Sequence, residues 1–128
     1  MQYPKRRKSG LRSGLEEKIA ADLKSKGILV KYETFKIAYI KPVTSHTYTP
    51  DFLLPNGIII EAKGLFSTQD RKKHILVKEQ HPELDIRFIF SSSKKKLYKG
   101  SKTTYADWCT KHGFLYADKI IPKEWYNV

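Results

Sequence analysis

The sequence predicts one α/β domain in which a mixed β-sheet is flanked by helices. Its 128 residues suit one ordinary domain, which is long enough to bury a hydrophobic core. The spacing of apolar residues predicts the order helix, strands, helix, strand, helix and strand, which is typical of α/β proteins. No internal repeat or linker splits the chain, so we expect residues 1–128 to fold as one unit.

The chain begins with a basic arm and an amphipathic helix. Residues 1–11 are rich in Lys and Arg and have no hydrophobic period, which indicates a flexible arm that could lie along phosphates. In the helix that follows, Ser13 can cap the N-terminus and Gly27 can end the last turn. The apolar residues spaced four apart are Leu15, Ile19 and Leu23.

Residues 28–48 read as extended structure. The alternation of apolar residues changes phase within this stretch, so we expect a bulge or turn near residues 33–34. Pro42 cannot donate to a strand ladder and interrupts the pattern. Strand character resumes over residues 44–49.

The remaining elements follow from turn residues and short apolar runs. His81-Pro82 disfavours continuation of a helix, and Gly113 can end another one. We expect a hairpin at 50–63, a helix at about 68–80, a buried strand at 85–90, a lysine-rich loop, a helix at about 104–112 and a short strand at 114–116.

The amino-acid composition indicates which kind of partner the protein binds and in which compartment it works. The chain has 25 Lys and Arg against 13 Asp and Glu, a formal net charge of +12, which favours a polyanion such as nucleic acid. Alternatively, the excess lysine only aids solubility. Cys109 is the single cysteine, which excludes an internal disulfide and fits a reducing compartment. No apolar run approaches the roughly 20 residues of a membrane span, so we expect a soluble, cytoplasmic protein.

The hairpin carries the residues with catalytic potential. Asp51 enters its first strand, and Glu61 and Lys63 leave its second strand as an acid-x-lysine triplet. Hard cations such as Mg²⁺ prefer oxygen ligands, which Asp51, Glu61 and the backbone carbonyl of Ala62 could supply. Lys63 could orient or deprotonate an attacking water and offset charge on a phosphate. The pattern predicts a metal-dependent DNA endonuclease.

The turn between the two strands decides whether these side chains can meet. Glu61 and Lys63 point to the same face of a strand. A two-residue turn would direct Asp51 to the other face, whereas a three-residue loop at 55–57 places Asp51 opposite Glu61. Proline and asparagine fit the two centres of a type I turn, and Gly57 fits the left-handed position that closes such a loop. We therefore predict the three-residue loop.

Simpler interpretations stay open for two features. The hairpin could be an ordinary surface hairpin, because acid-x-lysine triplets are common. Glu16 stands three residues after Ser13, which is the spacing of a capping box. Helical spacing also places Glu16 beside the apolar stripe, so the residues alone leave a helix cap and a metal ligand equally open.

Five segments form a more specific pattern over nearly the whole chain from about Leu11. They are RSGLEEK at 12–18, YTPDFLLPNGIIIEAKG at 48–64, DRKKHILVKEQHPELDIRFIFSSS at 70–93, KLYKGS at 96–101 and KHGFLYADKIIPKEW at 111–125. In order and spacing they resemble the bacteriophage endonuclease I family, which resolves four-way (Holliday) DNA junctions.

The resemblance implies a restriction-endonuclease-like core of the PD-(D/E)xK type and a homodimer in which the N-terminal helix and strand cross to the partner. The bridging segment would be about residues 40–48. Glu16 would join Asp51, Glu61 and Lys63 as a catalytic residue, supplied by the other subunit as a ligand of a second metal. Each site would hold one or two Mg²⁺ ions, for which Mn²⁺ substitutes.

The predicted reaction is hydrolysis of a phosphodiester by in-line attack of water, which leaves a 5′-phosphate. The substrate would be branched DNA recognised by its shape. Two other functions stay open: a PD-(D/E)xK nuclease on linear duplex DNA, and a non-catalytic module that binds branched DNA. Loss of one or more of the acidic site residues would indicate the non-catalytic module, and none of these residues is missing.

Basic residues outside the hairpin are candidates for phosphate contacts, although each could be a solvated charge. The candidates are Lys5, Arg6, Arg7, Lys8, Arg12, Arg71, Lys72, Lys73, Lys94, Lys95 and Lys96. His46, upstream of Asp51, could approach the scissile phosphate or be an ordinary surface residue. Tyr48 and Tyr98 could touch DNA, although packing is the commoner role of an aromatic residue.

Overall fold

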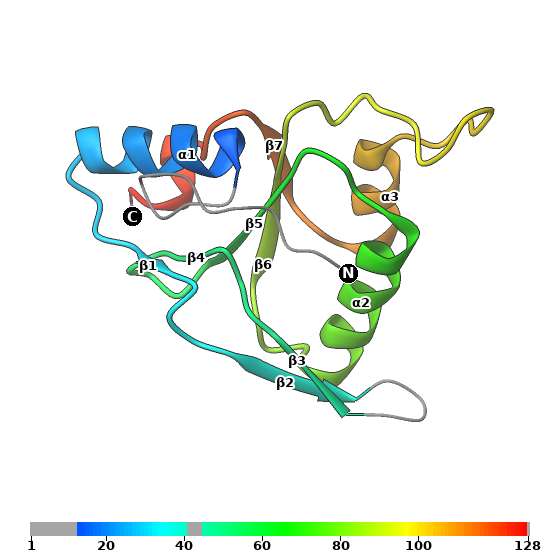
Figure 1. Ribbon diagram of the computed structural model, residues 1–128, viewed down its shortest axis with the longest axis horizontal. Coiled ribbons are helices and arrows are strands. Elements are labelled where there is room, and N and C mark those ends of the chain that lie inside the picture. Colours follow the sequence, from blue (N-terminus) through cyan, green and yellow to red (C-terminus); the bar gives the residue numbers. More distant parts are fainter. Residues whose placement is uncertain (1–12, 41–44, 128) are drawn as a thin grey trace.

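A five-stranded mixed sheet is the centre of the computed structural model, which describes residues 13–40 and 45–127 (Figure 1). Its order is β1-β4-β5-β6-β7, with antiparallel pairing from β1 to β5 and parallel pairing from β5 to β7. The strands are β1 (Lys31–Tyr32), β4 (Phe52–Leu53), β5 (Ile59–Lys63), β6 (Ile86–Phe90) and β7 (Tyr116–Asp118). β2 (Ile37–Ile40) and β3 (Ser45–Tyr48) form a separate antiparallel pair. The predicted mixed α/β class is confirmed.

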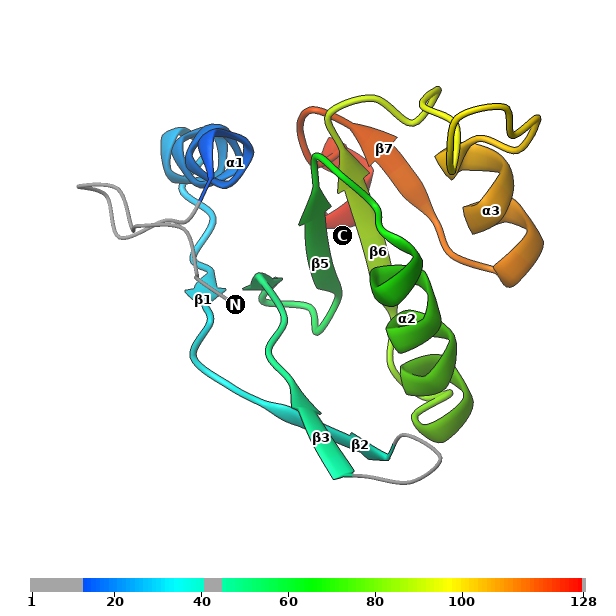
Figure 2. The same ribbon diagram turned by 45° about the vertical axis from the view of Figure 1, so that its right-hand side comes forward.

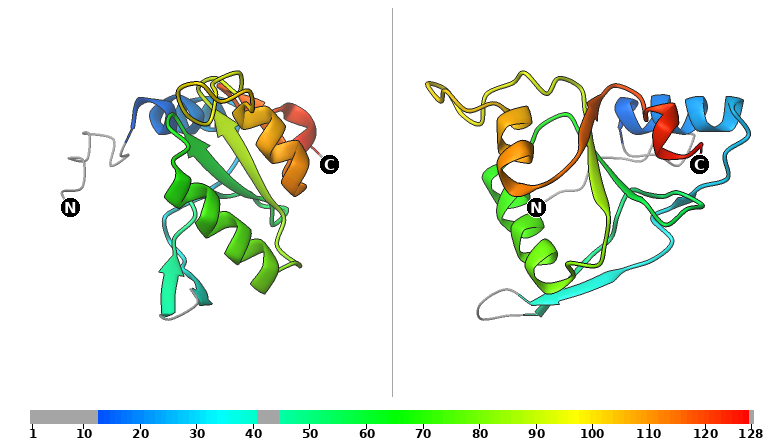
Figure 3. Two further views of the ribbon diagram at one scale, coloured as in Figure 1. Left: turned by 90° about the vertical axis from the view of Figure 1, so that its right-hand side faces the viewer. Right: turned by 180° about the vertical axis from the view of Figure 1, so that it is seen from behind.

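Helices cover both faces of the sheet. α2 (Thr68–Gln80) and α3 (Tyr105–His112) lie on one side, and α1 (Gly14–Ser25) lies on the other (Figure 2). The C-terminal 3-10 helix η1 (Lys123–Trp125) follows β7 at the C-terminal end of the chain (Figure 3). Its residue Trp125 accepts a hydrogen bond at the backbone O from Asn56 Nδ2 at 2.7 Å. No helix among the described residues is long and apolar enough to cross a membrane.

Side-chain caps explain where the helices begin. Ser13, Ser67 and Thr104 are the N-caps of α1, α2 and α3, and each accepts a hydrogen bond from a backbone N–H three residues later. The predicted helix at 68–80 is confirmed. The third helix begins at Tyr105, one residue later than predicted, because Thr104 is its cap.

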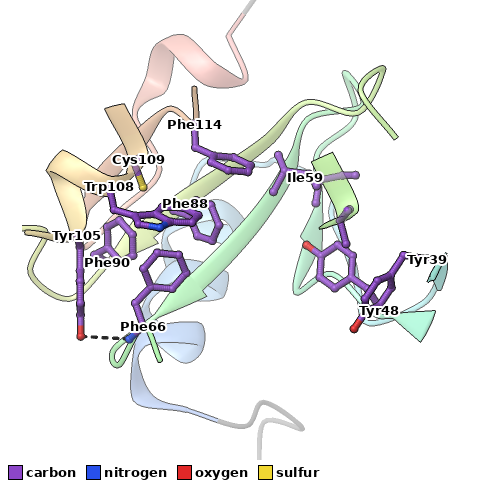
Figure 4. Packing of buried hydrophobic residues seen from close by; sticks show 12 residues of the cluster. Tyr39, Tyr48, Ile59, Phe66, Phe88, Phe90, Tyr105, Trp108, Cys109 and Phe114 are labelled. Atoms are coloured by element: carbon purple, nitrogen blue, oxygen red, sulfur yellow. Dashed lines mark hydrogen bonds between the residues drawn. The ribbon is translucent and has the colours of Figure 1, made fainter. Parts of the chain in front are cut away.

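The two faces of the sheet bury different cores. On the α2 and α3 side the core is mainly aromatic, and Phe66 lies with its ring centre 4.8 Å from that of Trp108 (Figure 4). On the α1 side, Ile19 and Leu23 pack with Phe52 and other mostly aliphatic residues. Neighbouring residues of β5 alternate between these cores, as expected for a strand that is buried on both faces.

Two sequence expectations about strands have different outcomes. A change in the extended pattern at residues 33–34 is confirmed, because Glu33 has a φ of +50° and separates β1 from β2. The last strand was predicted at 114–116 but spans Tyr116–Asp118. The reason is that Phe114 donates its backbone N–H to Cys109 O at 2.8 Å after Gly113 ends α3. Phe114 therefore belongs to the helix cap and the aromatic core.

The β4–β5 hairpin has the predicted three-residue loop. Phe52 pairs with Ile60, and Leu53 pairs with Ile59. Gly57 donates its backbone N–H to Leu54 O at 2.9 Å and has a φ of +92°. Continuing this register by one residue places Asp51 opposite Glu61.

Gly57→Ala is predicted to destabilise the fold by about 1 kcal/mol, because an L-residue with a Cβ is strained at positive φ. Chemical denaturation would measure the change. Gly14→Ala is the matched control, since its added Cβ meets open space in the first turn of α1 and should not destabilise. Equal stability of Gly57→Ala and the original chain would contradict the argument.

Candidate active site

Asp51 and Glu61 are held together by the backbone of the hairpin. Asp51 donates its N–H to Glu61 Oε2 at 3.1 Å, and Asp51 Oδ2 accepts from Ala62 N at 2.9 Å. Both side chains are buried, with 4% and 2% exposed. Each strand therefore fixes the carboxylate of the other.

The Glu61 carboxylate has partners on both of its oxygens. Oε2 also accepts from Tyr48 OH at 2.6 Å, and Oε1 lies 3.7 Å from Lys63 Nζ and 3.7 Å from His74 Nε2. His74 is fully buried, and neither ring nitrogen has a hydrogen-bond partner in the part of the chain that the structure describes. Burial holds the pKa of His74 well below its ordinary value, so the ring is neutral beside Glu61.

Lys63 is a cation fixed between two acids. Its Nζ lies 3.4 Å from Asp70 Oδ1, in addition to the contact with Glu61. Burial lowers the pKa of Lys63, but Glu61, Asp70 and Asp51 outweigh this effect and the pKa is raised. Lys63 is therefore a cation at neutral pH, which suits it to offsetting negative charge.

Glu16 reaches this site from α1. Ser13 Oγ accepts from Glu16 N at 3.0 Å and caps the helix, while the Glu16 carboxylate accepts from Tyr32 OH. One carboxylate oxygen from each of Glu16, Glu33 and Asp51 lies within 4.8 Å of the others. The serine therefore caps the helix backbone while the Glu16 carboxylate lies beside Asp51, in this case within one chain.

The crowding of carboxylates has an electrostatic cost at Asp51. Burial, followed by the charges of Glu61 and Glu16, raises the pKa of Asp51 well above its ordinary value. A divalent cation would offset this repulsion, and carboxylate oxygens are the donors that Mg²⁺ and Mn²⁺ prefer. The donor set at Asp51 therefore fits a hard divalent metal.

The gathered carboxylates differ from the ligand set that the sequence predicted. That set was Asp51, Glu61, the carbonyl of Ala62 and Glu16. In the structure the Glu61 oxygens contact Tyr48, Lys63 and His74, whereas Glu33 stands with Glu16 and Asp51. The sequence pattern did not single out Glu33 as a ligand, although the change of phase at residues 33–34 indicated an unusual backbone there.

Asp70 was also missed. Its Oδ2 accepts from Ser67 N at 3.2 Å, which completes a capping box at the start of α2, while Oδ1 faces Lys63. Burial raises the pKa of Asp70, but Lys63 and Ser67 outweigh burial and the pKa is lowered. The capping-box spacing of Ser67 and Asp70 was a signal in the sequence for the cap but not for the contact with Lys63.

The candidate phosphate-binding residues differ in exposure. Lys5, Arg6, Arg7, Lys8 and Arg12 lie outside the described residues. Lys72, Lys94, Lys95 and Lys96 are exposed, and Lys73 is half-buried. Arg71 is turned inward, where it donates to Phe66 O at 2.7 Å and Thr68 Oγ1 at 3.0 Å, so we correct its assignment as a surface contact.

The remaining candidates from the sequence lie apart from the carboxylates or inside the core. His46 lines a groove between β2, β3 and the end of α2 that contains none of Glu16, Asp51, Glu61 or Lys63. Tyr48 is buried and acts through its hydroxyl on Glu61, whereas Tyr98 is 66% exposed on the lysine-rich loop.

Comparison with known proteins gives three consistent findings. The family model for phage endonuclease I matches residues 2–128. Endonuclease I of Escherichia phage T7 is 60% identical over 120 residues, which cover 94% of this chain and 80% of that protein. Endodeoxyribonuclease 1 of Enterobacteria phage T3 is 64% identical over 111 residues, which cover 87% of this chain and 73% of that protein.

Asp51→Asn is predicted to stabilise the metal-free fold. Because the pKa of Asp51 is raised in the folded state, its stabilising contribution is lost as the pH rises from about 4 through the folded pKa. The amide keeps an oxygen for Ala62 N–H without the charge. We expect the melting temperature at neutral pH to rise by about 4 °C, which corresponds to about 1 kcal/mol.

Thermal melts in EDTA between pH 4 and pH 8 would measure this effect. The melting temperature of Asp51→Asn should exceed that of the original chain by a margin that widens as the pH rises. Glu79→Gln, which changes an exposed carboxylate on α2, is the control and should show no such trend. A difference that is constant over this range would contradict the electrostatic cause.

Proposed function

Because the chain belongs to the phage endonuclease I family, we propose that it is a metal-dependent DNA endonuclease that resolves four-way (Holliday) and other branched junctions. The observation that carries the proposal is the meeting of Asp51, Glu61 and Lys63 at one end of the hairpin, with Glu16 beside Asp51. These are the four residues that the family resemblance assigns to catalysis.

Asp51 and Glu16 would hold one or two Mg²⁺ ions, with Mn²⁺ as a substitute. Glu61 and the carbonyl of Ala62 lie on the neighbouring strand and complete the proposed set, and Glu33 adds a carboxylate to it. When bound, the metal would make water more acidic and offset negative charge on the phosphate.

The chain's own groups would prepare the reaction. Tyr48 OH and Asp51 N–H hold Glu61 in place, and Glu61 and Asp70 hold the Lys63 ammonium. Lys63 would stabilise the charge that develops on the phosphate during in-line attack. Hydrolysis would leave a 5′-phosphate on one side of the cut and a 3′-hydroxyl on the other.

A homodimer with exchanged N-terminal elements would cut a junction symmetrically. In this chain α1 packs its Ile19 and Leu23 against the sheet and brings Glu16 to Asp51. Exchange of α1 and β1 between two copies would keep these contacts, with residues 40–48 as the bridging segment, of which 41–44 lie outside the described residues. Each site would then combine Glu16 of one subunit with Asp51 of the other.

Branched DNA would be held by its backbone and shape. The exposed lysines of the loop at 94–96 lie beside the end of β5, where Lys95 Nζ donates to Gly64 O at 3.3 Å. Together with Lys72 and the basic N-terminal arm they would bind the phosphates of paired helical arms. We propose that the enzyme acts in the cytoplasm of a bacterial host.

Cleavage of a synthetic four-way junction and a matched linear duplex, each in Mg²⁺ and in EDTA, tests the proposal. We expect cuts in the junction in Mg²⁺ only. Lys63→Ala should slow cleavage by about 10²-fold to 10³-fold, because it removes a fixed positive charge from the transition state. The same variant should still bind the junction.

The other outcomes separate the alternatives. Equal cleavage of both substrates would favour a nuclease for linear duplex DNA, and binding without any cleavage would favour a non-catalytic module. Lys111→Ala is the matched control, because Lys111 is exposed on α3 and is not among the candidate phosphate contacts, so this variant should keep the original cleavage rate. Full activity of Lys63→Ala would refute its assignment.

Mixed dimers test whether the sites are composite. A subunit with Glu16→Gln and a subunit with Asp51→Asn should each be inactive alone. After the two are unfolded and refolded together, exchanged dimers contain one site with both carboxylates, so nicking should return to about one quarter of the original level with random pairing. Absence of any recovery in verified mixed dimers would contradict the exchange.

A further inference from the structure

A second lysine, Lys73, lies at the proposed active site. It is on α2, and its Nζ lies 5.3 Å from the centre of the Tyr48 ring. The hydroxyl of that ring is hydrogen-bonded to Glu61. The Lys73 ammonium is therefore one side chain away from the central carboxylate of the site.

The surroundings of Lys73 differ from those of Lys63. Lys63 contacts two carboxylates, those of Glu61 and Asp70. None of the ion pairs among the described residues involves Lys73. Its neighbour in the sequence, Lys72, is exposed, whereas Lys73 is half-buried.

The environment of Lys73 is unfavourable for a cation. Burial lowers the pKa of Lys73, and the nearby charge of Lys63 lowers it further, which outweighs the effects of Glu61, Asp70 and Asp51. A partly buried cation that repels a second cation and has no contacting anion gains free energy when an anion binds between the two. A phosphate is such an anion, and lysine binds phosphate as a point charge.

We propose that Lys73 is a further catalytic residue, whose ammonium contacts a non-bridging oxygen of the scissile phosphate on the side of the site that faces Tyr48. The inference rests on the proposed nuclease function and deepens it. Lys63 is fixed by two acids before DNA arrives, whereas Lys73 forms its ion pair with the DNA itself. The cation–π contact with Tyr48 holds Lys73 in place until then.

Lys73→Met tests this role, with Lys111→Met as the matched control, because Lys111 is an exposed lysine on α3 that is not among the candidate phosphate contacts. Methionine keeps an apolar stem over Tyr48 and removes the charge. At saturating enzyme, Lys73→Met should cleave the four-way junction about 10²-fold more slowly, while Lys111→Met should cleave at the original rate. Binding of the junction in EDTA should fall by less than about tenfold in either variant, as for the loss of one phosphate contact.

Chemical rescue separates a missing charge from a disturbed fold. Lys73→Cys can be alkylated with 2-bromoethylamine, which restores an ammonium group at nearly the same length of side chain. The only other cysteine, Cys109, is buried, and burial raises the pKa of its thiol to about 12, so it should react little. We expect alkylation, verified by mass spectrometry, to restore most of the lost cleavage rate.

The outcomes distinguish this inference from the proposed function. If the original chain does not cut the junction in Mg²⁺, the proposed function fails. If the original chain cuts and Lys73→Met cuts equally fast at saturation, Lys73 only supports the Tyr48 ring and the inference is overturned. A slow variant whose alkylated cysteine form stays slow, while alkylated Lys111→Cys remains active, would also overturn it.

Discussion

Asp51 and Glu61 are buried side by side across the β4–β5 hairpin, where the backbone N–H groups of each strand hold the carboxylate of the other. Two acids can be kept this close only if the register of the hairpin does not slip, because a shift by one residue would turn a side chain to the other face. The loop closed by Gly57 sets that register. The positions of the helices then matter for function, because α1 brings Glu16 to Asp51 and α2 brings Asp70 to Lys63.

This arrangement costs stability that the rest of the domain must supply. The like charges of Glu61 and Glu16 disfavour ionisation of Asp51, and His74 is buried without a hydrogen bond to either ring nitrogen within the described part of the chain. Two hydrophobic cores on opposite faces of the sheet offset these costs, one with Phe66 and Trp108 and the other with Ile19 and Leu23. Such a trade of stability for a charged site is common where binding requires clustered groups.

The sequence predicted the features that depend on local rules. The hairpin register followed from three loop residues, and the end of α2 followed from His81-Pro82. The positions of side chains that depend on contacts between distant parts of the chain could not be predicted from local sequence patterns. The inward turn of Arg71 depends on the carbonyl of Phe66, and the place of Glu33 depends on a backbone conformation that no residue type specifies. The last strand was displaced because Phe114 is held in the cap of α3.

The three lysines around α2 and β5 show why residue type alone does not define a site. Neighbouring acids raise the pKa of Lys63, burial and Lys63 lower the pKa of Lys73, and Lys72 is exposed to solvent. Lys63 is thus a cation held by two acids, and Lys73 is a partly buried cation with no ion pair among the described residues. Lys72 is an exposed cation. The difference arises because helical spacing turns Lys73 toward Tyr48 and the sheet while Lys72 points outward. A sequence pattern records three equivalent charges, whereas the fold places them in three different electrostatic surroundings.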